Sequence, residues 1–306
     1  MKDKRSIVDR IRIAAALLSA VLSLGCLAGC AASKDTSSQV PDEEMTQTET
    51  AEWFYDHFDR NQQSAYDAFR SSAEAPFNTE LTAIRAEDGS TAELSIPELD
   101  VVYQGFVYDH PEIFWLGSTY QYRVSSEGDE DYADAVAVIP DADSEEELRE
   151  RSETFEKAAE LILSEAAGEK GLPPERVAAQ IYEQLAANTN YTEEALYDPA
   201  LTKEHTAYGA IVTHSAVCDG LALAYRYLLD RCGIPCIVIP GEIDGAAHVW
   251  NTCFWDGRWH EMDLTWDISS GASGEAEYFD LTTEEMGRDH IRESEGIAAL
   301  IPISSK

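Results

Sequence analysis

The sequence predicts an α+β fold in which a helix packs on an antiparallel sheet behind a mainly helical N-terminal region, and three patterns support it. The apolar run Val217–Leu229 ends at a Gly-Ile-Pro stop signal, which is typical of a largely buried helix. The runs His248–Trp255 and Arg258–Trp266 are joined by Asp256-Gly257, a strong signal for a two-residue hairpin turn. Aromatic residues within Glu52–Arg70 recur at helical spacing, which indicates an amphipathic helix early in the chain.

The first thirty residues have the features of an export signal. Five basic residues precede or enter an apolar stretch, Ile13–Leu24, that is too short for a convincing membrane span. The stretch closes with Leu27-Ala28-Gly29-Cys30, which resembles a bacterial lipobox. That resemblance implies cleavage before Cys30 and a lipid on its sulfur, so the mature protein is expected on the outer face of the bacterial plasma membrane. The alternative is an ordinary secretory signal with a chance cysteine, and the protein is exported in either case.

The charge of the chain excludes some partners. It has 58 acidic and 22 basic residues, and removal of residues 1–29 takes away five basic and two acidic ones, which leaves a net charge of −39. Such a chain is not expected to bind nucleic acid or to bind anionic lipid electrostatically, so a lipid would have to provide the anchoring. The acidic residues either attract cationic substrates or simply keep the protein soluble.

Composition divides the mature chain into a flexible tether at residues 30–50, an N-terminal accessory region at 51–140 and a main domain at 141–306. Ser144 and Glu147 form a capping-box pattern at the start of a helix that runs to about Ala167. The other expected helices are Glu52–Arg70, Pro97–Tyr108 and Pro173–Asn188, and short extended pieces are expected at Glu112–Leu116, Thr119–Ser125 and Ala133–Ile139.

Cys218 falls in the first turn of the predicted buried helix. Unpaired N–H groups and the positive end of the helix dipole both favour a thiolate at this position. Cys218 is therefore a candidate nucleophile, although a lone buried cysteine is more often an inert apolar residue.

The hairpin supplies candidate partners for that thiol. If the Asp256-Gly257 turn sets the register, paired residues have numbers that sum to 513, so His248 faces Thr265 and Asp263 faces Trp250. His248 and Asp263 are then diagonal neighbours on one face, with backbones roughly 5–8 Å apart. A carboxylate at that distance can hold an imidazole, so the chain offers a nucleophile, a base and an orienting acid.

Six short motifs around these residues resemble the core of the bacterial transglutaminase-like family. They are Ala207-Tyr208-Gly209-Ala210-Ile211-Val212, Val217-Cys218-Asp219-Gly220, Gly233-Ile234-Pro235-Cys236, His248-Val249-Trp250-Asn251, Asp256-Gly257-Arg258-Trp259 and Asp263-Leu264-Thr265-Trp266-Asp267. The resemblance implies a papain-like core in which Cys218 is the catalytic thiol, His248 the base and Asp263 the orienting acid. Leu221 departs from the pattern, because the family commonly has an aromatic residue there. The tail, including Asp289-His290, also resembles the group, but the sequence assigns it no chemistry.

Several alternatives remain open at the sequence level. Cys253 and His260 also sum to 513 and, with Cys232 and Cys236, could hold zinc, although the spacing matches no tight ligand pattern. A disulfide among the three cysteines is another possibility in an exported protein. Ser215 fits a helix cap better than a nucleophile.

The sequence therefore predicts a cell-surface enzyme that transfers acyl groups from amide bonds of peptides or proteins through Cys218. No metal or organic cofactor is required, and hydrolysis, as in a cysteine protease, is favoured over transglutamination because it needs only water. The alternative is a non-catalytic surface module that binds peptide or glycan in the same cleft.

Overall fold

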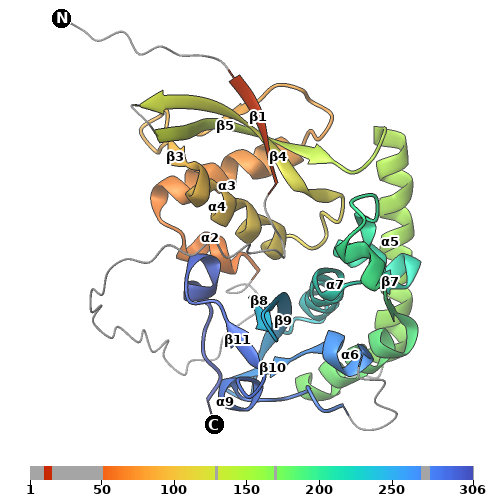
Figure 1. The fold of residues 1–306 in the computed structure, drawn as a ribbon. Coiled ribbons are helices and arrows are strands. Elements are labelled where there is room, and N and C mark those ends of the chain that lie inside the picture. Colours follow the sequence, from red (N-terminus) through yellow and green to blue (C-terminus); the bar gives the residue numbers. More distant parts are fainter. Residues whose placement is uncertain (1–9, 16–50, 128–129, 169–170, 270–275, 306) are drawn as a thin grey trace, which may run out of the picture.

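A computed structural model of the protein describes residues 10–15, 51–127, 130–168, 171–269 and 276–305. In this part of the chain the strands form a five-stranded sheet, a four-stranded sheet and a two-stranded pair, with helices beside them. Figure 1 shows the five-stranded sheet at one end of the molecule and the four-stranded sheet, with α7 beside it, at the other. The α+β class with a helical N-terminal region is confirmed.

The N-terminal helices pack against the five-stranded sheet. They are α2 (Trp53–His57), α3 (Arg60–Ala73) and α4 (Ile96–Asp109), and the latter two contact β5. The single helix expected over Glu52–Arg70 is wrong, because Asp59 interrupts it. The Asp59 side chain accepts hydrogen bonds from the N–H groups of Asn61 and Gln62 and so starts a new helix.

The sheet in this region is larger than the sequence indicated. Its strands are β1 (Arg10–Ala15), β2 (Thr82–Ala83), β3 (Leu94–Ser95), β4 (Leu116–Glu127) and β5 (Glu130–Pro140), in the order β1-β4-β5-β2 with β3 also paired to β5. The expected strand Glu112–Leu116 is wrong except for Leu116, because the preceding residues form turns. Strand β1 lies inside the predicted export signal. Cys30 and the predicted tether lie outside the described residues.

The next segment carries two of the expected helices. They are α5 (Glu145–Ala166), whose Ser144 cap accepts the Glu147 N–H, and α6 (Pro174–Asn188). The shorter elements that follow are β6 (Asn190–Tyr191), η1 (Glu193–Leu196), η2 (Lys203–His205), η3 (Gly209–Thr213) and β7 (Ser215–Ala216). Ser215 is not a helix cap, because it lies in β7 and its hydroxyl bonds that of Thr192.

The second sheet has the strand order β10-β9-β8-β11. Its strands are β8 (Cys236–Ile243), β9 (Ala246–Trp255), β10 (Arg258–Met262) and β11 (His290–Arg292). The register predicted from the turn is confirmed, since His260 pairs with Cys253, and Asp256 and Gly257 both have the positive φ that this turn requires. The strand predicted to run to Trp266 ends at Met262.

Helix α7 (Cys218–Arg231) packs on β8 and β9, and α8 (Leu264–Ser269), α9 (Thr283–Met286) and η4 (Gly296–Leu300) complete the described chain. A buried ion pair connects α7 to the N-terminal region. Arg226 on α7 donates to Asp109 at the end of α4, with 3.1 Å between Nη2 and Oδ1, and both side chains are fully buried. The predicted boundary near residue 140 therefore separates regions that share a buried contact. None of the helices in the described ranges is long and apolar enough to span a bilayer.

Candidate active site

Cys218 is the first residue of α7, as the sequence predicted, and only 2% of it is exposed. The start of this helix is held tightly against the segment before it. A Cβ atom on Gly220 would lie 2.4 Å from the Glu204 carbonyl oxygen and 2.9 Å from that of Thr206. Because no larger residue fits there, Gly220 fixes how closely the first turn, and with it the thiol, approaches this segment.

The electrostatic environment of the thiol differs from the expectation. Burial raises the pKa of Cys218 well above its usual value, and the neighbouring carboxylates of Asp219 and Asp263 raise it further. Hydrogen bonds from the backbone N–H groups of Val249 and Asp219 lower this pKa but do not outweigh burial. Burial therefore opposes the thiolate that the start of the helix favours.

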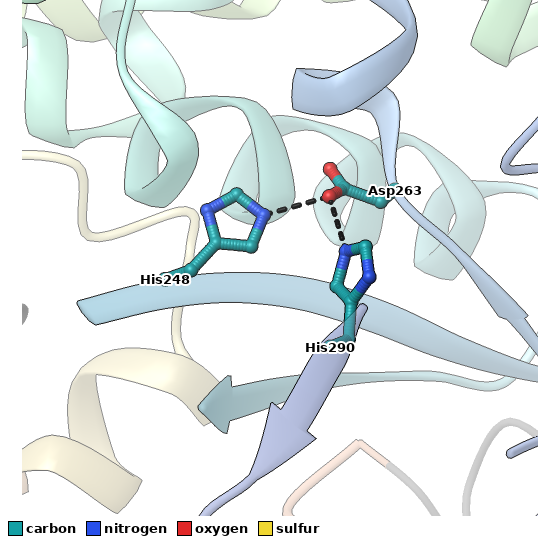
Figure 2. Close-up of side chains that lie close together, drawn as sticks. All are labelled: His248, Asp263 and His290. Carbon is teal, nitrogen blue, oxygen red and sulfur yellow. Dashed lines mark hydrogen bonds and ion pairs between the residues drawn. The ribbon is translucent and has the colours of Figure 1, made fainter. Parts of the chain in front are cut away.

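His248 comes from β9, next to the Val249 N–H that reaches the thiol, and 7% of it is exposed. Its Nε2 lies 2.7 Å from Asp263 Oδ2 (Figure 2). An ionised carboxylate can only accept hydrogen bonds, so Nε2 carries the proton and Nδ1 keeps its lone pair. The structure thus brings two of the predicted residues into direct contact, with the free ring nitrogen available as a base.

Asp263 directly follows β10 and precedes α8. Its Oδ1 accepts the Trp266 N–H at 3.1 Å, which is a helix N-cap interaction and explains why the strand ends where it does. The Tyr182 hydroxyl donates to the Asp263 carbonyl and to Asp267. Burial alone would raise the pKa of Asp263, but His248 and His290 outweigh it and hold this pKa well below its usual range.

His290 is a third residue that contacts Asp263 at this site, and the sequence assigned it no role. It lies on β11, and its Nε2 is 2.9 Å from the same Asp263 Oδ2 that binds His248 (Figure 2). The only local signal was the tail motif Asp289-His290. Its proximity to Asp263 depends on the pairing of β11 with β8, which no nearby turn encodes.

The cysteine-based alternatives are not supported. Cys218, Cys232, Cys236 and Cys253 are free thiols, so the disulfide considered as an alternative for the last three is absent from the described residues. His260, the proposed fourth zinc ligand, is instead bonded to Asp280. Within the ranges that the structure describes, the side chains close enough to share a metal ion are those of His248, Asp263 and His290, and not the cysteines.

A cavity of about 360 Å³ lies close to the nucleophile helix, between the end of α4 and the segment that contains η1 and η2. Its wall is mainly apolar and includes Val107, Phe114, Leu116, Leu196, Tyr197 and Leu223. His205, which also lines it, is bonded to Asp219 with 2.9 Å between Nδ1 and Oδ2. Through His205, the wall of the cavity is therefore hydrogen-bonded to Asp219, the residue that follows Cys218.

Comparison with known proteins concerns the same part of the chain. Residues 163–264 match the transglutaminase-like superfamily. This segment is about one third of the chain and contains Cys218, His248 and Asp263. The kyphoscoliosis peptidases of Mus musculus and Homo sapiens are each 30% identical to this chain over 66 residues, which is 18% of this chain and 10% of each relative. The chain thus spans only about a tenth of these relatives.

Three solved structures are similar to this protein over part of their length. A structure named as a TGase has 16% identity and a TM-score of 0.36, with coverage of 50% of this chain and 46% of the other. A candidate cysteine protease from Cytophaga hutchinsonii has 14% identity and a TM-score of 0.32, with coverage of 61% and 62%. A candidate protease from Parabacteroides distasonis has 12% identity and a TM-score of 0.27, with coverage of 53% and 40%.

Proposed function

We propose that this protein is a cysteine-dependent enzyme that acts on amide bonds of peptides or proteins, with Cys218, His248 and Asp263 as its catalytic residues. The observation that carries the proposal is the hydrogen bond between His248 and Asp263 next to a cysteine at the start of a buried helix. All three residues lie in the transglutaminase-like segment, and relatives of that segment are named as peptidases.

In the proposed mechanism His248 acts first as a base. Nδ1 removes the proton from Cys218 as the sulfur attacks the carbonyl carbon of the substrate. The oxyanion that forms is placed to accept a hydrogen bond from the Cys218 N–H at the helix start. The imidazolium then protonates the leaving amine, the C–N bond breaks, and an acyl-enzyme thioester remains. Asp263 holds the ring and stabilises its positive charge throughout.

Water is the favoured acceptor of the acyl group. Hydrolysis requires only that His248 activate a water molecule, which attacks the thioester and releases the acid and the thiol. Transfer to an amine would require a second binding site that excludes water. The tryptophans that could have formed such a site are mostly in the core, since Trp250 and Trp259 are buried.

The decisive assay uses the purified protein, a glutamine-containing protein and a fluorescent primary amine. We expect peptide cleavage or deamidation that is abolished in Cys218→Ala and unchanged in Cys232→Ala, a thiol that is half-buried at the other end of α7. Stable incorporation of the amine in excess of hydrolysis would make the protein a transferase. Activity that persists in Cys218→Ala would rule out the proposed nucleophile.

A non-catalytic binding module is the second candidate, and two observations favour it. The Cys218 thiol is buried, which raises its pKa, and an apolar cavity of about 360 Å³ lies nearby. Such a cavity suits the side chain of a bound peptide. If the protein is such a module, the wild type and Cys218→Ala should bind the peptides of a library equally well. Neither should cleave or modify any of these peptides.

The location of the enzyme is a separate part of the proposal. We propose that lipid on Cys30 anchors it to the outer face of the bacterial plasma membrane, on the basis of the lipobox-like Leu27-Ala28-Gly29-Cys30. Cys30→Ser should release the protein from the membrane fraction into the medium, because so acidic a chain has no electrostatic attraction to anionic lipid. Cys26→Ser is the matched control and should stay in the membrane fraction. Retention of both variants would contradict the assignment.

A further inference from the structure

We propose that His290 is a positioning residue of this site, an imidazolium that holds the Asp263 carboxylate and disfavours a second positive charge on His248. The inference rests on the proposed function for its catalytic consequence. The charge of His290 is inferred from the contacts of its ring alone and does not depend on that function.

Both nitrogens of the His290 ring face carboxylates. Nε2 lies 2.9 Å from Asp263 Oδ2, and Nδ1 lies 2.6 Å from Asp289 Oδ1, with the side chain fully buried. Ionised carboxylates only accept hydrogen bonds, so each ring nitrogen must carry a proton. Burial lowers the pKa of His290, but the hydrogen bonds and charges of Asp263 and Asp289 outweigh it and raise this pKa above its usual value. The ring is therefore an imidazolium at neutral pH.

The second histidine fixes the orientation of Asp263. Oδ2 accepts a hydrogen bond from each imidazole, and Oδ1 accepts the Trp266 N–H. With both oxygens held, the carboxylate cannot rotate, and it presents the same atom to His248 Nε2–H at all times. His248 consequently stays in the tautomer whose Nδ1 can accept the thiol proton.

The charge of His290 also acts on His248. The two ring centres are 5.7 Å apart, so a positive charge on one disfavours a second positive charge on the other. This opposes a resting thiolate–imidazolium pair, as does the burial of Cys218. The titratable groups in contact with His290 are Asp263, Asp289, His248 and Tyr278. Tyr278 donates to Asp289, and Arg292, further along β11, is paired with Glu261. Among these groups His248 is the one whose protonation should respond to the charge of His290.

A metal ion is the competing interpretation of this cluster, because ligand atoms of His248, Asp263 and His290 lie within 4.8 Å of one another. The three atoms are already joined by hydrogen bonds of 2.7 and 2.9 Å. A metal would have to displace the protons of both Nε2 atoms, as metal ligands must be deprotonated. The hydrogen-bonded cluster therefore requires protons on the Nε2 atoms of His248 and His290, whereas a metal site requires that both atoms be unprotonated.

The test follows the histidine rings of the whole protein by ¹⁵N NMR between pH 5 and 8, after treatment with EDTA. In wild type we expect His290 to carry two ring protons at pH 7. In His290→Gln the pKa of His248 should rise by about one to two pH units, as expected when a unit charge at this distance is removed. His57→Gln, an exposed histidine in α2, is the control and should leave His248 unchanged.

The acid limb of the kcat/KM profile should move upward with the His248 titration in His290→Gln. A purely structural role would lower kcat/KM equally at every pH. A neutral His290 ring in wild type, an unmoved His248 titration, or ring signals that change on removal of metal would overturn the proposal. If His290→Gln does not fold, the number of ring protons on His290 in the wild type still decides whether the proposal holds. The NMR result does not depend on turnover, so a shifted titration in a protein without activity would contradict the proposed function and not this inference.

Discussion

Two buried aspartates, Asp109 and Asp263, show how similar surroundings can give opposite properties. Asp109 accepts hydrogen bonds from Arg226, from the Tyr66 hydroxyl and from two backbone N–H groups of α2. Asp263 accepts hydrogen bonds from two histidines and one backbone N–H group. Both are fully buried, and both connect segments that are far apart in the sequence.

Their pKa values shift in opposite directions. Burial raises the pKa of Asp109 to about 6 despite the opposing charge of Arg226, whereas the two histidines lower the pKa of Asp263 in spite of burial. The partners also differ in what they can do, because arginine keeps its proton while histidine can give one up near neutral pH. Asp109 is therefore a structural connection between two regions, and Asp263 is connected to groups that can transfer protons.

The largest expected effect separates these roles. Asp263→Asn should lower kcat by about ten-thousandfold, because an amide can hold His248 in the wrong tautomer. The unfolding midpoint in urea should change far less than the activity. Arg226→Met is the comparison variant and should retain kcat wherever it is folded. Equal losses of activity in the two variants would show that the aspartates do not differ in role.

Arg226→Met should have the largest effect on stability. It leaves the Asp109 carboxylate buried without its cation, and we expect a loss of about 3–5 kcal/mol in the free energy of unfolding at pH 7. Urea denaturation measures it. The double variant Asp109→Leu/Arg226→Met should recover part of the loss, since the Asp109 carboxylate is then absent and only Asp230, 3.5 Å from Arg226 Nε, has lost this cation. A double variant as unstable as the single one would contradict this explanation.

The pH dependence of stability should also distinguish the two carboxylates. The folded pKa of Asp109 lies above its unfolded value, so its contribution is most favourable below about pH 4 and declines as pH rises to about 6. The folded pKa of Asp263 is lowered, so its contribution is present above about pH 4 and lost below it. Relative to wild type, Asp109→Asn should gain up to about 3 kcal/mol between pH 4 and 7. A pH-independent difference in urea midpoint would refute the assignment.

The smallest expected effect concerns a single hydroxyl. Tyr66→Phe removes one donor to the Asp109 carboxylate and should cost about 1.5 kcal/mol. Tyr103→Phe, whose hydroxyl donates to the Gly117 carbonyl, is a matched control with a neutral acceptor and should cost about 1 kcal/mol or less. Thermal unfolding of the two variants would rank them, and a greater loss in Tyr103→Phe would contradict the charged state of Asp109.

Local patterns in the sequence predicted the parts of the site that they encode. The stop signal after Leu229 identified the Cys218 helix, and Asp256-Gly257 gave the register of the β9–β10 hairpin. The prediction that Asp263 lies on a strand is wrong, because its side chain caps α8, yet it still reaches His248 from there.

The contacts that the sequence did not predict are long-range. His290 is separated from Asp263 by 27 residues and reaches it only because β11 joins the edge of β8. Arg226 and Asp109 are 117 residues apart, in segments joined by no common turn. Helical or strand periodicity describes one element at a time, so it carries no information on which elements become neighbours.

The position of His290 along the chain has a consequence for biogenesis. Synthesis proceeds from the N-terminus at about 5–20 residues per second, so the thiol of Cys218 leaves the ribosome well before the strand that carries His290. Strand β11 must then pair with β8, and the C-terminal segment must bind back to α2 through the Leu300 carbonyl and Trp53. The nascent chain thus contains Cys218 before it contains the groups that complete the cluster around Asp263. Assembly of that cluster is consequently a late event, after nearly all of the described chain has been made.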